Sequence, residues 1–248
     1  MSIKQKILST LDDGDGYLVS SLSTKDLEVL RALILEQYKS VMLRNHPELA
    51  DTACDVGLQN YHELEISDQQ HKAMWTKQNR TLFQEAISVF RNLDFFERLE
   101  YELGSLIITN EDQTRTEEIY WRLVRPNHSE DIGPMHADAW FWDLQNGAID
   151  HGLRRLKIWI AVFTECGSNG LKIVPRSQHM KINFSGEKRD GKFKPVKNLE
   201  LESRSDTMLV PTNPGNFILF HDNLLHGGAM GGSSTRVSLE FTALCRIE

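Results

Sequence analysis

The stretch LKIWIAVFTECGSNGLKIVP, residues 156–175, holds two β-type runs separated by a turn rich in Gly, Ser and Asn. Similar short runs follow residue 104 at 105–109, 118–126, 207–211, 216–221 and 236–244. Several short strands with turn residues between them indicate an antiparallel sandwich or barrel. We therefore predict a mainly β fold for residues 105–248, a double-sheet jelly roll, also called a double-stranded β-helix.

Before residue 104 the pattern is different, because apolar residues recur there at helical spacing. The segment 23–42 begins with Ser23 or Thr24 as a candidate N-cap, and one face of the expected helix collects Leu27, Leu30, Leu33 and Ile34. Residues 67–103 predict one or two further amphipathic helices. We expect residues 1–104 to form a largely helical layer that supports the jelly roll within a single domain, 1–248. A generic α+β domain is the alternative that the pattern leaves open.

Composition limits the classes of partner. Lys and Arg number 28 against 35 Asp and Glu, so the net charge is -7. Phosphate contacts need a basic face, and this balance argues against a general nucleic-acid binder. The N-terminal residues have no apolar core of signal-peptide length, and no apolar run approaches a membrane span. Three scattered cysteines without CxxC spacing favour reduced thiols, so we expect a cytoplasmic protein without a membrane partner.

The segment GPMHADAWFWD, residues 133–143, places an imidazole and a carboxylate in an aromatic-rich run. On a strand, His136 and Asp138 would point to the same face, because side chains alternate. A third metal ligand must come from elsewhere, and His226, at the end of an apolar run and before glycines, is the preferred candidate. His221 competes for that role. Two imidazoles and one carboxylate leave half of an octahedron open, which suits non-haem Fe(II).

A candidate carboxylate clamp follows His226 on the next expected strand. Arg236 and Ser238 share one strand face, and a guanidinium donates two parallel hydrogen bonds to a carboxylate. The distal carboxylate of 2-oxoglutarate requires such a clamp, while its 2-oxo acid end can chelate iron. The spaced combination of HxD, His and RxS is far more specific than any of its parts.

These segments resemble the phytanoyl-CoA dioxygenase-like family of Fe(II)/2-oxoglutarate oxygenases, whose fold is a cupin-like double-stranded β-helix. The segment 15–32, DGYLVSSLSTKDLEVLRA, is similar to the family's opening strand and helix, and MHADAW (135–140) to its HxD segment. The resemblance continues through WIAVFTECGSNGLKIVPRSQH (159–179), PGNFILFHDNLLHGG (214–228) and RVSLEF (236–241).

The resemblance implies a set of site residues and a reaction. It makes His136, Asp138 and His226 the catalytic iron ligands, and assigns Arg236, Ser238 and Trp159 to 2-oxoglutarate. It further implies that O₂ and 2-oxoglutarate are consumed, with release of succinate and CO₂, to hydroxylate a small molecule. One turn departs from the family pattern, because Arg176 replaces a glycine and Gln178 is inserted after Ser177.

Substrate contacts are predicted at three residues. Trp140 would share the ligand face, Arg125 (with Arg122 on the same run) could meet a carboxylate, and Arg176 lies in the turn bordering the site. The basic segments LRRLK (153–157) and 181–197 could attract an anionic substrate. Residues 183–198 are expected to form a surface loop or lid, and an ordinary solvated loop is the simpler explanation of their charge.

Other functions stay open at this point. The same cofactors support desaturation, epimerisation or ring formation. A His₂Asp zinc hydrolase or isomerase would use the same ligands, but would leave Arg236 without a role. A non-catalytic jelly-roll binding module is a further alternative. The oligomeric state cannot be read from the sequence.

Overall fold

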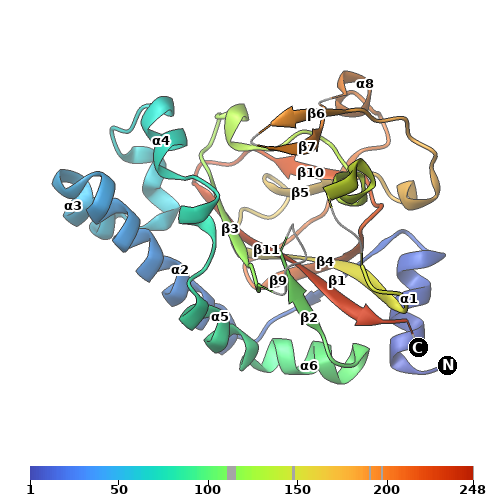
Figure 1. Ribbon diagram of the computed structural model, residues 1–248. Coiled ribbons are helices and arrows are strands. Elements are labelled where there is room, and N and C mark those ends of the chain that lie inside the picture. The colour runs from blue at the N-terminus through green and yellow to red at the C-terminus, as the bar shows by residue number, and fades with distance from the viewer. Residues whose placement is uncertain (111–115, 147–148, 190, 197, 248) are drawn as a thin grey trace.

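The computed structural model describes residues 1–110, 116–146, 149–189, 191–196 and 198–247 (Figure 1). Its helices are α1 (Ile3–Asp12), α2 (Thr24–Asn45), α3 (Ala50–Val56), α4 (Asp68–Met74), α5 (Gln84–Arg91), α6 (Asp94–Leu103), α7 (Ala139–Phe141) and α8 (Leu199–Glu202). Its strands are β1 (Tyr17–Ser21), β2 (Ile107–Thr109), β3 (Tyr120–Val124), β4 (Leu153–Phe163), β5 (Gly170–Ile173), β6 (Gly186–Arg189), β7 (Lys192–Pro195), β8 (Met208–Leu209), β9 (Asn216–His221), β10 (His226–Ala229) and β11 (Arg236–Arg246).

Two antiparallel sheets form the core of the fold, as the sequence predicted. The larger sheet has the order β1-β9-β4-β11-β2, and β3 also pairs with β11. The smaller sheet has the order β10-β5-β8, and β6 and β7 form a separate hairpin. Each of the seven predicted runs contains a strand, and β1 matches the short opening strand that the resemblance implied.

The central strand β4 shows why the large sheet is covered on both faces. Ile158, Ile160 and Val162 point to one side and belong to the main apolar core, which the helices complete. Trp159 and Ala161 point to the other side and pack with residues of the smaller sheet. Side chains alternate along a strand, so an almost unbroken apolar run is what a strand buried on both faces requires.

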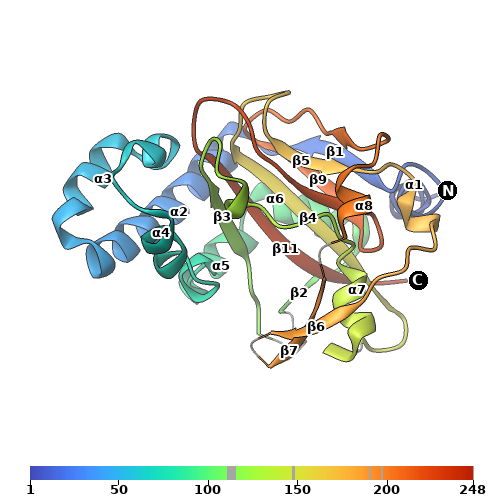
Figure 2. The ribbon, with the colours of Figure 1, turned by 90° about the horizontal axis from the view of Figure 1, so that it is seen from above.

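The helices α2, α5 and α6 cover the outer face of the large sheet (Figures 1 and 2). Ser23 is the N-cap of α2, where its side chain accepts a hydrogen bond from the backbone of Asp26 at 3.0 Å. The buried carboxylate of Asp26 in turn accepts from the backbone N–H of Phe95 at 3.0 Å, in the first turn of α6. This contact satisfies an otherwise unpaired helix-terminal donor and fixes the two helices against each other.

Two segments differ from the prediction. Residues 67–103 contain three α-helices, not one or two, because extended backbone at Phe83 and Leu93 separates α4, α5 and α6. The expected surface loop at 183–198 contains the hairpin of β6 and β7, with Gly191 at φ 81° in its turn. Its Asp-Gly dipeptide is a strong hairpin signal that the polar composition of the segment concealed. No helix among the described residues combines the length and apolarity needed to cross a bilayer.

Candidate active site

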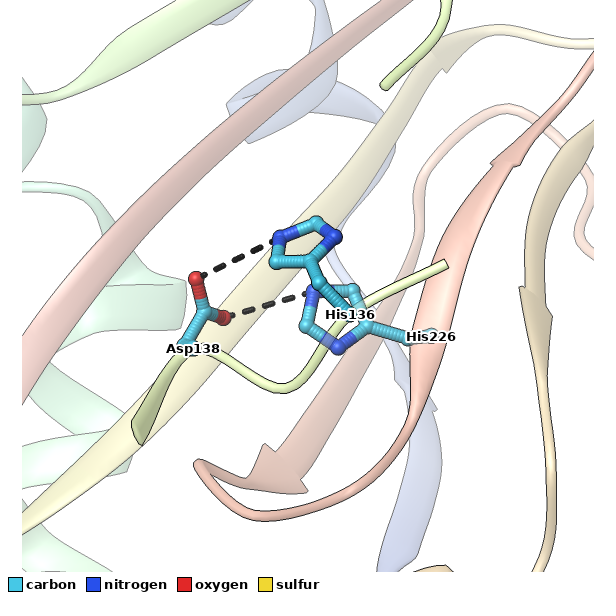
Figure 3. A group of neighbouring side chains, drawn as sticks. All are labelled: His136, Asp138 and His226. Carbon is cyan, nitrogen blue, oxygen red and sulfur yellow. Dashed lines mark ion pairs between the residues drawn. The ribbon is translucent and has the colours of Figure 1, made fainter. Parts of the chain in front are cut away.

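Three side chains from distant parts of the chain converge on one point. The Nε2 atom of His226 lies 3.3 Å from Asp138 Oδ2, and the Nε2 atom of His136 lies 3.8 Å from Asp138 Oδ1 (Figure 3). Ligand atoms of all three residues fall within 4.8 Å of one another. This spacing and the mixture of imidazole and carboxylate fit a divalent transition metal.

The backbone holds the two histidines in register. His136 and His226 form an isolated antiparallel bridge with N–H···O distances of 2.9 and 2.8 Å. The Nδ1 of each ring makes a hydrogen bond with a nearby backbone carbonyl. His136 contacts the carbonyl of Pro134 at 2.7 Å, and His226 contacts that of Leu224 at 2.8 Å. Carbonyls only accept, so both Nδ1 atoms carry the proton and both Nε2 lone pairs remain available to a metal.

The HxD pair does not lie on a regular strand, contrary to our expectation. Only His136 makes a bridge, whereas Asp138 has helical dihedral angles, φ -62° and ψ -33°, and precedes α7. The turn into this short helix brings the carboxylate back toward the imidazole. Strand alternation therefore does not position the pair.

The protonation states suit metal binding. Burial lowers the pKa of His226 to about 4, against the opposing effect of Asp138, so its imidazole is neutral at pH 7. Burial alone would raise the pKa of Asp138, but Lys157 and the two imidazoles outweigh it and hold that pKa at about 2. The site thus offers neutral imidazole and charged carboxylate together.

An inner cavity lies behind the cluster, between the two sheets. It is lined by His226, Trp159 and Arg236 as well as by His136 and Asp138. Arg236 donates to the carbonyl of Gly170 at 3.1 Å, and its guanidinium carbon lies 5.9 Å from the Trp159 ring centroid. Burial, with the nearby Arg122, lowers the pKa of Arg236 to about 10, so it stays charged at neutral pH.

Two buried polar atoms at or near the inner cavity have no partner in the protein. The Nε of Arg236, which lines the cavity, has no hydrogen-bond partner within the described residues, and the same holds for the buried hydroxyl of Ser238, two positions further along β11. An unsatisfied buried donor costs free energy, and two of them on one strand face fit the carboxylate end of a 2-oxo diacid. The residues present therefore fit both groups that the sequence implied.

An outer cavity of about 330 Å³ opens on the other side of His136 and Asp138. Phe141 and Trp142 provide an aromatic part of its wall. Its other lining residues are mostly polar or charged: Lys77, Arg80, Thr109, Asn110, Tyr120, Arg122, Lys157, Lys194, Pro195, Glu240 and Thr242. A volume of this size accommodates a small molecule next to the metal ligands.

Lys157 and Glu240 are shared by the two cavities. Lys157 Nζ lies 3.4 Å from Asp138 Oδ2 and donates to Thr242 Oγ1 at 2.8 Å. Glu240 accepts from Arg122, with nitrogen–oxygen distances of 2.8 and 2.6 Å. The strand period could have identified both residues, because Lys157 lies two positions before Trp159 and Glu240 two positions after Ser238.

Trp140, one of the three predicted substrate contacts, does not line either cavity. It lies in α7, is 5% exposed, and stacks on Phe184 with ring centroids 4.9 Å apart. The helical turn after Asp138 rotates it away from the ligand face.

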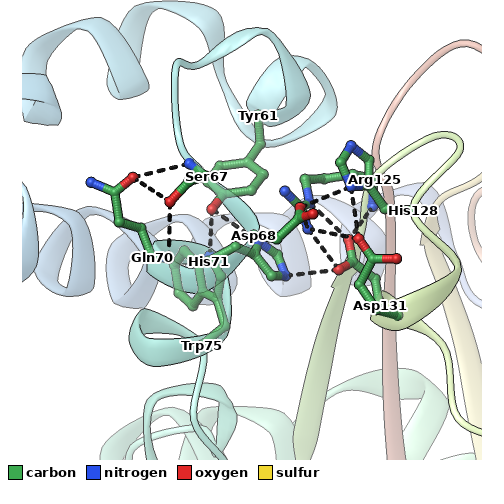
Figure 4. Close-up of polar contacts among 10 residues, drawn as sticks. Tyr61, Ser67, Asp68, Gln70, His71, Trp75, Arg125, His128 and Asp131 are labelled. Atoms are coloured by element: carbon green, nitrogen blue, oxygen red, sulfur yellow. Dashed lines mark hydrogen bonds and ion pairs between the residues drawn. The ribbon is translucent and has the colours of Figure 1, made fainter.

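Arg125 is occupied by a buried polar network between α4 and the segment after β3 (Figure 4). It makes two hydrogen bonds of 2.9 Å to Asp131 and contacts Asp68 at 2.9 Å. The Nε2 of His71 lies 3.3 Å from the same Asp131, and its Nδ1 lies 3.0 Å from the hydroxyl of Tyr61. This network anchors the segment that leads into His136.

Arg176 also lies outside the two cavities, in the turn where the family has glycine. Its φ of 64° is in the left-handed region, which explains why glycine suits this position. The neighbouring Ser177 accepts a hydrogen bond from the backbone of Leu225 at 2.7 Å, directly before His226. The inserted Gln178 donates to the carbonyls of Leu11 and Gly14. The turn therefore helps to hold the backbone directly before His226 in place.

The basic segments are only partly directed at the site. Lys157 and Lys194 line the outer cavity. Arg154 instead makes a bidentate pair with Asp12, at 2.9 and 2.8 Å, and Arg155 lies over the Trp142 ring at 4.1 Å. Asp190 and Lys197, which belong to the second basic segment, lie outside the described residues.

Known proteins share the fold. The chain is similar to the non-haem monooxygenase ThoJ in its nickel complex, with 12% identity, a TM-score of 0.52, and coverage of 100% of this chain and 80% of that one. It is similar to iron-bound EctD from S. alaskensis, with 14% identity, a TM-score of 0.53, and coverage of 96% and 75%. It is also similar to EvdMO1, with 15% identity, a TM-score of 0.55, and coverage of 99% and 50%. No curated protein sequence matches the chain.

The family is given by a match to the sequence itself. The family model described as phytanoyl-CoA dioxygenase (PhyH) matches residues 23–236, which include all three converging side chains and Arg236. The match thus spans most of the chain and ends at the first residue of β11. The chain belongs to the phytanoyl-CoA dioxygenase (PhyH) family of Fe(II)/2-oxoglutarate-dependent oxygenases.

Proposed function

We propose that this protein hydroxylates a small molecule bound in the outer cavity, with 2-oxoglutarate in the inner cavity and Fe(II) held by His136, Asp138 and His226. The observation that carries the proposal is the arrangement of two cavities that meet at the same two ligands, His136 and Asp138. When bound, Fe(II) and 2-oxoglutarate supply the oxygen activation that is coupled to release of succinate and CO₂.

The chain's own residues have separate tasks in this proposal. Arg236 and Ser238 bind the distal carboxylate of 2-oxoglutarate, because both have a buried donor without a partner and Arg236 lines the inner cavity. Trp159, 2% exposed, closes the inner cavity against water. Lys157 holds the Asp138 carboxylate in its charged form and steadies its orientation through a contact with Oδ2.

An anaerobic titration tests the proposal. Addition of Fe(II) and then 2-oxoglutarate should produce a visible charge-transfer band near ~500 nm, as expected of a 2-oxo acid chelated at iron. His136→Ala should abolish the band, whereas His179→Ala, in an exposed turn, should leave it unchanged. No band and no succinate in air would reject the proposal and favour the zinc hydrolase or isomerase.

A further inference from the structure

Arg80 is a cation in the outer cavity that no carboxylate contacts. It ends the short 3₁₀ turn Gln78–Arg80, where its Nε donates to the carbonyl of Trp75 at 2.9 Å. This bond fixes the direction of the guanidinium. Within the described residues it makes no other hydrogen bond or ion pair, and it lines the cavity that His136 and Asp138 share. Its terminal nitrogens are therefore available to a ligand.

The electrostatic surroundings of Arg80 favour an anion. Burial, followed by repulsion from Arg122, lowers the pKa of Arg80 to about 10, so the group remains charged at neutral pH. Arg122 is not a counter-charge but a second cation, whose own carboxylate partner is Glu240. Glu240 and Asp131 partly offset this lowering of the pKa, but they form ion pairs with Arg122 and Arg125, so among the described residues Arg80 has no carboxylate partner of its own.

The outer cavity as a whole is lined by more cations than carboxylates among the described residues. Its described lining contains five cationic side chains, Lys77, Arg80, Arg122, Lys157 and Lys194, and two carboxylates, Asp138 and Glu240. Asp138 is a proposed ligand of the metal. The two positive charges of the metal would be balanced by the two negative charges of 2-oxoglutarate. Glu240 is engaged by Arg122, and Lys77 has its partner in Glu118 outside the lining. Among the described lining residues, the charge of Arg80 is therefore the one that the metal, the cosubstrate and these ion pairs leave without a counter-charge.

2-Oxoglutarate itself does not account for Arg80. Its distal carboxylate is assigned to the unpaired donors of Arg236 and Ser238, and Arg80 does not line that inner cavity. Its other end is assigned to the metal. The anion that Arg80 would bind must therefore belong to a second molecule, and a guanidinium is the group best shaped to hold a phosphate or carboxylate through two parallel bonds.

We infer that the outer cavity binds an anionic substrate, whose phosphate or carboxylate is held by Arg80 while its apolar part packs on Phe141 and Trp142. This inference rests on the proposed function, because it treats the outer cavity as the substrate site. Such a cavity selects among substrates by charge. A neutral compound of the same shape leaves the Arg80 guanidinium without a partner and therefore binds more weakly.

Calorimetric binding of phenyl phosphate, benzoate and the neutral phenol tests the inference. The protein is loaded anaerobically with Fe(II) and 2-oxoglutarate, so that the inner cavity is filled. We expect the two anions to bind more tightly than phenol, and Arg80→Ala to weaken the preferred anion at least ten-fold. Arg80→Lys should retain part of the affinity. The preferred anion identifies the group as phosphate or carboxylate.

Arg44→Ala is the matched control. Arg44 lies on the exposed surface of α2, and its Nε also donates to a backbone carbonyl, that of Ser40 at 3.2 Å, so the variant loses the same charge and the same type of bond. It should bind the anions as the wild type does. If Arg80→Ala does not fold, Arg80→Gln retains a donor for the Trp75 carbonyl and serves in its place.

The outcomes separate this inference from the proposed function. Absence of the charge-transfer band in the wild type would reject the proposed function and the inference with it. A normal band with no anion binding, or with equal affinity in wild type and Arg80→Ala, would overturn the inference alone. A ten-fold loss of 2-oxoglutarate affinity in Arg80→Ala, with anion binding unchanged, would assign Arg80 to the cosubstrate and also overturn it.

Discussion

His136 and His226 are joined by two mutual backbone hydrogen bonds, and their rings lie with centroids 4.5 Å apart. The bridge fixes the separation of two proposed metal ligands through the main chain, before any metal is bound. A preorganised pair of this kind reduces the conformational entropy lost on metal binding.

Replacement of His226 should remove metal binding, whereas replacement of His221 should not. His221 ends β9 and accepts from the backbone of Asn223 at 2.9 Å, and it lines neither the inner nor the outer cavity. We expect His226→Ala to lose Co(II) affinity by more than about 100-fold, because one of three ligands is removed. Anaerobic Co(II) titration followed by absorbance measures this. Equal loss in His221→Ala would contradict the ligand assignment.

Arg236→Ala should weaken 2-oxoglutarate binding without unfolding the protein. The loss should be about 10- to 100-fold, as expected for charged hydrogen bonds worth about 1.5–3 kcal/mol. Arg246→Ala, at the exposed end of the same strand, is the control and should retain wild-type affinity. Titration of the charge-transfer band gives both values. Unchanged affinity in Arg236→Ala would refute the clamp.

Asp131 should stabilise the fold through the network shown in Figure 4. Its side chain is 2% exposed and accepts from Arg125 and from the backbone N–H of Arg125. Asp131→Ala leaves Arg125 without its buried partner, so we expect a loss of about 3 kcal/mol in the free energy of unfolding. The neighbouring Glu130→Ala, an exposed carboxylate, should change it by less than about 0.5 kcal/mol. Urea denaturation distinguishes them, and similar losses in both variants would argue against the network.

His71 should make stability depend on pH. Burial is the main reason that its pKa is lowered to about 4, so the unfolded state binds its proton more readily than the folded state. Stability therefore falls as the pH decreases from about 6.5 toward 4, because over this interval His71 is protonated in the unfolded chain and neutral in the folded protein. Allowing for solvent screening, we expect the free energy of unfolding to decrease by about 2 kcal/mol between pH 7 and pH 4.5.

The control for this pH effect is His71→Gln, which keeps a polar side chain near Tyr61 and Asp131 but has no titrating group. Denaturation of both proteins at pH 7 and at pH 4.5 gives the difference. The wild type should lose more stability than the variant over this interval. Parallel losses would show that other groups cause the pH dependence.

Local patterns in the sequence were enough to predict most strands and the start of α2. The alternation in β4, with Ile158 and Ile160 on one side and Trp159 on the other, encodes a strand covered by helices and by a second sheet. Ser23 fixes the start of α2 through a local hydrogen bond. These features depend on residues close in sequence, so a period or a cap is enough to reveal them.

Which side chains meet depends instead on the folded arrangement of distant segments. It chose His226 over His221 through the bridge to His136, rotated Trp140 away through the turn into α7, and bound Arg125 to Asp131. It also brought Arg80, from the helical layer, into a cavity lined by strands. Such convergence depends on strand pairing and on turns between distant segments, and neither leaves a periodic signal in the residues that it brings together.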